Sequence, residues 1–382
     1  MTNYDDFFAE FPSVSKAEWL RQIAKDLKGR PLEELNWQVS DDLVVSPFAH
    51  ADDFPVPPQP LTEVPHPWEI CEAVTVTDPV AANRQVLDAL EGGVESIQFW
   101  LETPLDSTAF SQLLDSVYLD YIGLHFAGPG MTANPGTLMA QLGRLAKARN
   151  VPTEQLHGSL AYDPAAVLTL SLQPDWCYLT DLVQYAREQF PGFRMIHPGP
   201  APVSTPSHSE VEVDLLHQAS LYLEKLTERG IPVDQAAASM HFSITIGKSY
   251  FLEIARLRAF KLLWLNVLKA WGATPVYPNI AVRFEPDAYT DDLYTTMIRA
   301  TTMSMSAVLG GADRLTVLPY DAGREAQATY PQTFSRRMAR NVQHLLKMES
   351  GFDQLADPAA GSYYIEALTQ QLAAKGWMEF RR

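Results

Sequence analysis

The sequence predicts a (β/α)₈ barrel preceded by an N-terminal arm. Strand-like apolar runs alternate with helical patterns over most of the chain, and a proline-rich stretch separates this repeating part from the first helix. Alternating strands and helices favour right-handed parallel βα units, and eight such units over about 300 residues close a barrel of common size. A doubly wound open sheet is the main alternative, but its G-x-G-x-x-G phosphate turn does not occur here.

The arm is expected to cover residues 1–70 and to contact another subunit. Ser15 and Glu18 have the spacing of a capping box, and apolar residues follow them at helical intervals. Gly29 is expected to end this helix. Residues 47–68 contain seven prolines in 22 residues, which neither a helix nor a central strand sustains. The pattern therefore predicts one helix followed by an extended connector.

The barrel is expected to cover residues 71–382. Its strand-like runs are residues 96–101, 117–119, 121–126, 156–162, 193–197, 239–246, 279–284 and 314–319. The helical patterns between them cover residues 81–90, 135–148, 179–190, 211–229, 250–270 and 291–309. Barrel enzymes carry their active sites at the C-terminal ends of the strands, so the residues just past each run are the first candidates for an active site.

Composition excludes several classes of protein. The 29 basic and 46 acidic residues give a net charge of −17, which argues against a nucleic-acid partner. Cys71 and Cys177 are too few and too far apart for a disulfide framework or a zinc site, and they fit a reducing cytoplasm. The acidic N-terminus has no signal-peptide pattern, and no apolar run approaches the roughly 20 residues that span a bilayer. We therefore expect a cytoplasmic protein without a membrane or nucleic-acid partner.

Four residues are candidates for lining a pocket at the barrel rim: Asp163, His197, His241 and Asp321. Each lies within or just after a strand-like run. Asp163 precedes a proline and would equally suit a helix cap, and a strand histidine is more often a hydrogen-bonded core residue. No G-x-S-x-G, H-E-x-x-H, Walker A or C-x-x-C pattern occurs, so we assign no catalytic, cofactor-binding or metal-binding residue.

Two groups of basic residues need an explanation. Arg256, Arg258 and Lys261 lie on the predicted helix 250–270, where a solvated or salt-bridged face is the usual role. Residues 334–340, FSRRMAR, form the densest basic cluster, which would suit a phosphate, an acidic neighbour or plain surface.

Several long motifs resemble methylmalonyl-CoA mutases. They are SKAEWLRQIAKDLKGRPLEELNW near the N-terminus, EIARLRAFKLLW in the predicted helix, and the C-terminal stretch from AVLGGADRLTVLPYD through RRMARNVQHLLKMESGFDQLADPAAGSYYIEALTQQLAAKGW. The resemblance implies a barrel that encloses a CoA thioester and an arm that grips a partner. It also implies adenosylcobalamin, which the family holds through a D-x-H-x-x-G loop of a second, flavodoxin-like domain. None of the nine histidines has Asp two positions earlier, so the cofactor would belong to the assembled enzyme and would not be bound by this chain alone.

The rim departs from the pattern of catalytic family members. They carry a GYH-type histidine and an EAGA run after the fifth strand, where this chain has IHPGPAPVSTPSHSEVEVD with His208 out of register. Leu170 falls where a CoA-contacting arginine would stand, and Thr316 occupies a histidine position. Val317, Leu318 and Pro319 replace a polar TNS run. The ADRLTVLPYD form of the last strand and the stretch AANRQVLDALEGGVESIQFWL instead resemble the small, non-catalytic subunit of the heterodimeric bacterial enzymes.

Three hypotheses follow. The first is a structural small subunit whose large catalytic partner carries the cobalamin and interconverts methylmalonyl-CoA and succinyl-CoA. The alternative is the substrate-binding barrel of a split acyl-CoA mutase, in which a separate cobalamin-binding protein completes the site and the four candidates line a pocket for a CoA thioester. The third, an unrelated barrel enzyme with a phosphorylated substrate, is disfavoured because no glycine-rich phosphate loop is present.

Overall fold

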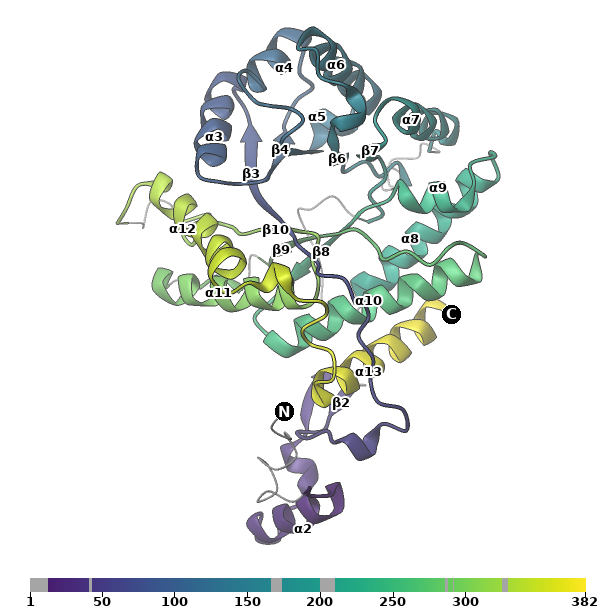
Figure 1. Ribbon diagram of the computed structural model, residues 1–382, viewed down its shortest axis with the longest axis vertical. Coiled ribbons are helices and arrows are strands. Elements are labelled where there is room, and N and C mark those ends of the chain that lie inside the picture. The colour runs from purple at the N-terminus through teal and green to yellow at the C-terminus, as the bar shows by residue number, and fades with distance from the viewer. Residues whose placement is uncertain are drawn as a thin grey trace, which may run out of the picture.

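A computed structural model describes residues 13–40, 43–165, 174–199, 210–285, 288–290, 292–324 and 329–382. Within these ranges, eight parallel strands hydrogen-bond in the order β7-β6-β5-β4-β3-β10-β9-β8. A single parallel bridge between Ile196 and Met240 joins the regions of the two outer strands, β7 and β8. The strands therefore follow one another around a barrel in chain order, and helices surround them (Figure 1). The predicted barrel is confirmed.

The strands are β3 Glu69–Val76, β4 Ser96–Leu101, β5 Gly123–Ala127, β6 His157–Leu160, β7 Gly192–Arg194, β8 Phe242–Ile246, β9 Ile280–Phe284 and β10 Arg314–Thr316. The helices are α3 Pro79–Glu91, α4 Ser107–Leu113, α5 Pro129–Thr132, α6 Pro135–Ala148, α7 Trp176–Gln189, α8 Glu210–Thr227, α9 Val233–Ala238, α10 Tyr250–Ala270, α11 Leu293–Leu309, α12 Gln332–His344 and α13 Tyr363–Phe380. The predicted ranges 96–101, 135–148 and 250–270 coincide with β4, α6 and α10.

One predicted strand is wrong and one strand was missed. Residues 117–119 form no strand, because their loop finds its hydrogen bonds elsewhere: the guanidinium of Arg149 donates to the carbonyls of Leu114 and Val117 at 2.8 Å. The first barrel strand is instead β3, which directly follows the proline-rich connector. Its run EICEAVTV contains two glutamates among its first four residues, and these interrupt the apolar pattern of a buried strand.

The N-terminal segment is anchored by a short antiparallel hairpin. Helix α2, Lys16–Asp26, begins with the predicted capping box of Ser15 and Glu18. Strand β1, Trp37–Ser40, pairs with β2, Leu43–Val45. Leu43 and Val45 form an apolar cluster with residues of α10 and α13, so the hairpin packs on the two helices that cover one side of the barrel (Figure 1). The boundary at residue 70 remains a prediction.

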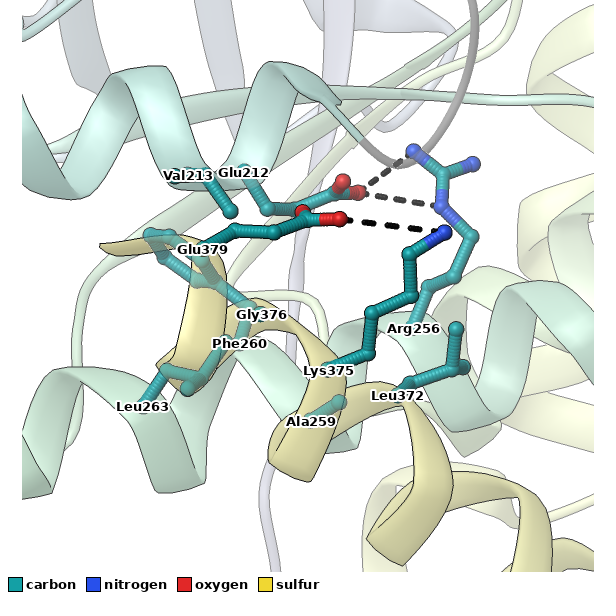
Figure 2. Close-up of a pocket in the computed structure, with 10 residues that line it drawn as sticks. All are labelled: Glu212, Val213, Arg256, Ala259, Phe260, Leu263, Leu372, Lys375, Gly376 and Glu379. Carbon is teal, nitrogen blue, oxygen red and sulfur yellow. Dashed lines mark hydrogen bonds and ion pairs between the residues drawn. The ribbon is translucent and has the colours of Figure 1, made fainter. Parts of the chain in front are cut away.

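Helix α10 is buried along most of its length, and its arginines pair with carboxylates instead of facing solvent. The guanidinium of Arg256 donates to Glu212 of α8 and to Glu253, and Figure 2 shows the Glu212 pair beside a cavity of about 30 Å³ between α8, α10 and α13. Arg258 pairs with Asp357 and Glu366. The predicted basic face of this helix is thus salt-bridged but not solvated.

The basic cluster at residues 334–340 meets acidic neighbours. Arg340 of α12 donates to Glu72 of β3 at 2.8 Å and to Asp88 of α3 at 3.3 Å, and Arg336 donates to Asp88 at 2.7 Å. These pairs fasten the helix after the last barrel strand to the first βα unit. Within the described ranges, no helix combines the length and the apolar character that crossing a membrane requires.

Candidate functional site

The candidate site is the polar interior of the barrel. Successive side chains of a strand point to opposite faces, so alternate residues of each strand line the inside. In an ordinary barrel of this class the inward positions carry mostly branched apolar side chains. Here they carry the imidazole of His125, the hydroxyl of Ser159 and the guanidinium of Arg314, all of them buried. Such an interior requires internal hydrogen bonds.

These three residues and the half-buried Glu69 of β3 form one hydrogen-bonded network across the barrel. His125 of β5 donates from Nε2 to Glu69 Oε2 at 2.9 Å, and its Nδ1 accepts from the Ser159 hydroxyl at 2.8 Å. Arg314 of β10 donates to the Ser159 oxygen at 3.4 Å. Burial and the charge of Arg314 lower the pKa of His125 to about 4, so the imidazole is neutral near pH 7.

The carboxyl group of Glu69 remains ionised within this hydrogen-bonded network. Burial by itself would raise the pKa of the carboxyl group, but the hydrogen bond from His125 and the neighbouring basic groups outweigh it and lower the pKa to about 2. Burial also lowers the pKa of the Arg314 guanidinium. An ionised carboxylate, a neutral imidazole and a guanidinium therefore share the barrel interior.

The structure brings two of the predicted residues, His197 and His241, together. Their ring centroids are 5.0 Å apart, and each residue is 1% exposed. His241 donates from Nε2 to the Leu160 carbonyl at 2.9 Å, whereas the ring of His197 lies near the backbone of Gly199. Burial lowers the pKa of His197 to about 4, and Arg314 and Arg283 add to this effect. Burial likewise lowers the pKa of His241.

Arg283 of β9 faces the same interior. Within the described part of the chain its guanidinium has neither a hydrogen bond nor an ion pair. Burial lowers the pKa of this guanidinium to about 10, so it remains charged at pH 7. An unpaired guanidinium next to a neutral imidazole is a suitable environment for an anionic group.

The two predicted aspartates lie apart from the histidine pair. Asp163 is 6% exposed; its Oδ1 accepts from the Tyr222 hydroxyl and, at 3.1 Å, from the backbone N–H of Ala165. Asp321 is 1% exposed, and neither of its carboxylate oxygens has a hydrogen-bond partner among the residues that the structure describes. Burial raises the pKa of the nearby Tyr289, and the charge of Asp321 contributes.

Five residues of this site were not predicted from the sequence: Glu69, His125, Ser159, Arg283 and Arg314. The available signal was their alternation, since residues 157 and 159, like 123 and 125, share one face of a strand. Glu69 was overlooked because β3, the strand that it begins, was not predicted. His208 and Leu170, which the family pattern singled out, lie outside the described residues. Among the ranges described, no group of three histidine, cysteine or acidic side chains could hold a metal ion.

Fold and interior together define a parallel (β/α)₈ barrel protein whose strands enclose imidazole and guanidinium groups. The family model described as "Methylmalonyl-CoA mutase" matches residues 103–382. The chain therefore belongs to the methylmalonyl-CoA mutase family.

Curated relatives extend the match over almost the whole chain. The methylmalonyl-CoA mutase small subunit of Porphyromonas gingivalis is 32% identical over 98% of this chain and 64% of its own length. The small subunit of Streptomyces virginiae is 30% identical with the same coverage. A methylmalonyl-CoA mutase of Cereibacter sphaeroides is 27% identical over 94% of this chain and 57% of its own length. The chain thus spans less than two thirds of the length of these relatives.

Proposed function

We propose that this chain is the structural, non-catalytic small subunit of an adenosylcobalamin-dependent methylmalonyl-CoA mutase. The proposal rests on the burial of the four polar residues that were predicted to line a pocket at the rim. Asp163, His197, His241 and Asp321 are all at most 6% exposed, and Asp163 is held by a tyrosine hydroxyl. A catalytic acid or base must come within hydrogen-bond reach of its substrate, which such burial opposes. The two similar small subunits point in the same direction.

The partner in this proposal supplies the cobalamin. The residues of this chain do not fit the cofactor, because no histidine has Asp two positions earlier and the paired histidines of the barrel are 1% exposed. The partner would be a large catalytic subunit that interconverts methylmalonyl-CoA and succinyl-CoA.

The N-terminal arm is the proposed contact with that partner. Trp37 and Val44 of the hairpin are 38% and 46% exposed, and large apolar side chains of this kind anchor protein interfaces. Replacing both with serine should weaken co-purification with the catalytic subunit at least tenfold. The matched control replaces Tyr118 and Tyr121, an exposed aromatic pair on a barrel loop, and should leave association unchanged. Equal loss in both variants would contradict a specific role for the arm.

Turnover tests the subunit role directly. The purified chain is incubated with methylmalonyl-CoA and adenosylcobalamin, first alone and then with its co-purified partner. We expect succinyl-CoA only with the partner. Formation of succinyl-CoA by the chain alone would refute the proposal.

The unpaired guanidinium of Arg283 beside His197 favours one second candidate, the substrate barrel of a split acyl-CoA mutase. Calorimetry with a CoA thioester distinguishes the two functions. The split-mutase hypothesis predicts saturable binding that is lost in Arg283→Gln, His197→Ala and Asp163→Ala, and kept in Arg187→Gln, an exposed arginine of α7. The structural role predicts no binding to the unaltered chain.

A further inference from the structure

A cavity of about 240 Å³ lies at the N-terminal end of the barrel, where β8 and β9 begin. Its walls come from α9, from the C-terminal half of α10, and from the segment Thr274–Asn279 that leads into β9. Three other cavities between described residues measure only about 30 to 40 Å³ each. The cavity is therefore large enough for an organic molecule. It lies at the end of the barrel opposite to the rim residues Asp163 and Asp321.

The cavity combines a cation with an apolar wall. Arg194, the last residue of β7, lines it, and its guanidinium has no hydrogen bond or ion pair with any residue that the structure describes. Met240, Phe242, Trp264 and Leu268 supply the apolar side, and all four are buried. Pockets that bind small molecules have this composition, mostly apolar with a few polar groups that fix orientation.

Among the described residues, no carboxylate forms an ion pair with Arg194. A second cation shares this part of the barrel: burial, and to a smaller extent the charge of Arg194, lowers the pKa of the Arg314 guanidinium. The one acidic residue of the lining, Asp234, is engaged elsewhere, because its carboxylate accepts the Thr274 N–H at 2.7 Å and the Thr274 hydroxyl at 3.4 Å. An anion placed against Arg194 would supply the missing partner.

We propose that this cavity binds a small organic carboxylate with an apolar body, whose carboxylate pairs with Arg194 and whose apolar part packs against Trp264 and Met240. A guanidinium pairs well with a carboxylate, often through two parallel hydrogen bonds. The volume lies below the roughly 300 to 1,000 Å³ of drug-sized pockets, which favours a small ligand. The proposal does not depend on the proposed subunit role.

Calorimetry on the full chain with benzoate and isovalerate tests the proposal. We expect saturable binding of one molecule per chain. Arg194→Gln should weaken binding at least tenfold, and Arg194→Lys, which keeps the charge but not the planar fork, by less. Arg187→Gln is the matched control and should bind as the unaltered chain does. Benzamide, the uncharged analogue of benzoate, and inorganic phosphate, which lacks an apolar body, should bind at least tenfold more weakly.

A second readout covers the case in which Arg194→Gln does not fold. Binding in this cavity should change tryptophan fluorescence, and the change should disappear in Trp264→Phe. The proposal is overturned if benzoate and isovalerate do not saturate the unaltered chain, if benzamide or phosphate binds equally well, or if folded Arg194→Gln binds with unchanged affinity. Because these measurements use this chain alone, their failure leaves the mutase assay with the partner unaffected.

Discussion

Replacing Arg258 with methionine should destabilise the protein more than any surface substitution. Arg258 lies on α10 and is 1% exposed. It donates to Glu366 Oε1 of α13 at 2.7 Å and also pairs with Asp357. Methionine would preserve much of the apolar packing of the arginine stem but would remove the charge. Two buried carboxylates would then lose their shared cation.

The contacts that remain set the magnitude. Asp357 still accepts the Leu61 N–H at 2.7 Å, and Glu366 the Gly361 N–H at 3.2 Å, so neither carboxylate is left entirely without donors. Removing one partner of a buried ion pair typically costs about 3–5 kcal/mol, and we expect a loss in this range. With an unfolding entropy of about 2.1 cal/mol/K per residue, the whole chain unfolds with about 0.8 kcal/mol/K. The expected fall in Tm is therefore about 4–6 °C.

Thermal unfolding followed by circular dichroism measures this change. The control is Arg21→Met in α2, where an exposed guanidinium lies 3.9 Å from Glu18, a pair expected to contribute less than about 1 kcal/mol. Limited proteolysis gives a second readout, because the ion pairs also hold the connector at Leu61 and the start of α13. If Arg258→Met melts within about 1 °C of the unaltered protein, the buried pairs do not contribute as argued here.

The remaining predictions concern pH, a buried carboxylate and a glycine. His197 has an unperturbed pKa of 6.5 and a folded-state pKa of about 4. As the pH is lowered, the unfolded chain therefore binds a proton at this residue before the folded protein does, and the free energy of unfolding should decrease from about pH 6.5 to about pH 4. This residue can contribute at most about 1.4 kcal/mol per pH unit to the free energy of unfolding. In His197→Asn the urea midpoint should therefore depend less steeply on pH. An unchanged dependence would contradict the lowered pKa of His197. Tyr222→Phe removes a hydroxyl donor from the buried Asp163 carboxylate, and it should lower the free energy of unfolding measured in urea by about 1–3 kcal/mol. A loss below about 0.5 kcal/mol would mean that another donor replaces this hydrogen bond. Gly311→Ala should cost about 1 kcal/mol more than Gly230→Ala. Both glycines have positive φ, of 80° and 85°, but only the first lies against the ammonium of a half-buried lysine, Lys261, whose hydrogen bond to the Gly311 carbonyl would be disturbed; equal melting temperatures would refute this.

Local patterns were sufficient for most of the elements. The capping box of Ser15 and Glu18, the helical spacing of residues 135–148 and the strand run of residues 96–101 all depend on neighbours within a few positions. These features can therefore be predicted from the sequence without knowledge of the fold. Residues 117–119 were misassigned because an apolar run looks the same whether it pairs as a strand or packs as a loop. Pairing depends on distant residues, here the side chain of Arg149.

The candidate site was less predictable, because its members come from distant strands. His197 and His241 could be nominated one by one, but only the closure of the barrel places their rings 5.0 Å apart. The hydrogen bond between Ser159 and Arg314 joins residues 155 positions apart. No local pattern marks such a pair.

The sequence by itself determined most of the βα units, the N-terminal capping box and membership of the mutase family, since each of these depends on periodicity or on contiguous motifs. Only the tertiary structure decided which charges are buried together. Arg258 meets Asp357 and Glu366 across separations of 99 and 108 residues, and the guanidinium of Arg194 lines a cavity with no ion-pair partner among the described residues. The physical reason is that hydrogen bonds and ion pairs act over a few ångströms of space, whatever the distance along the chain.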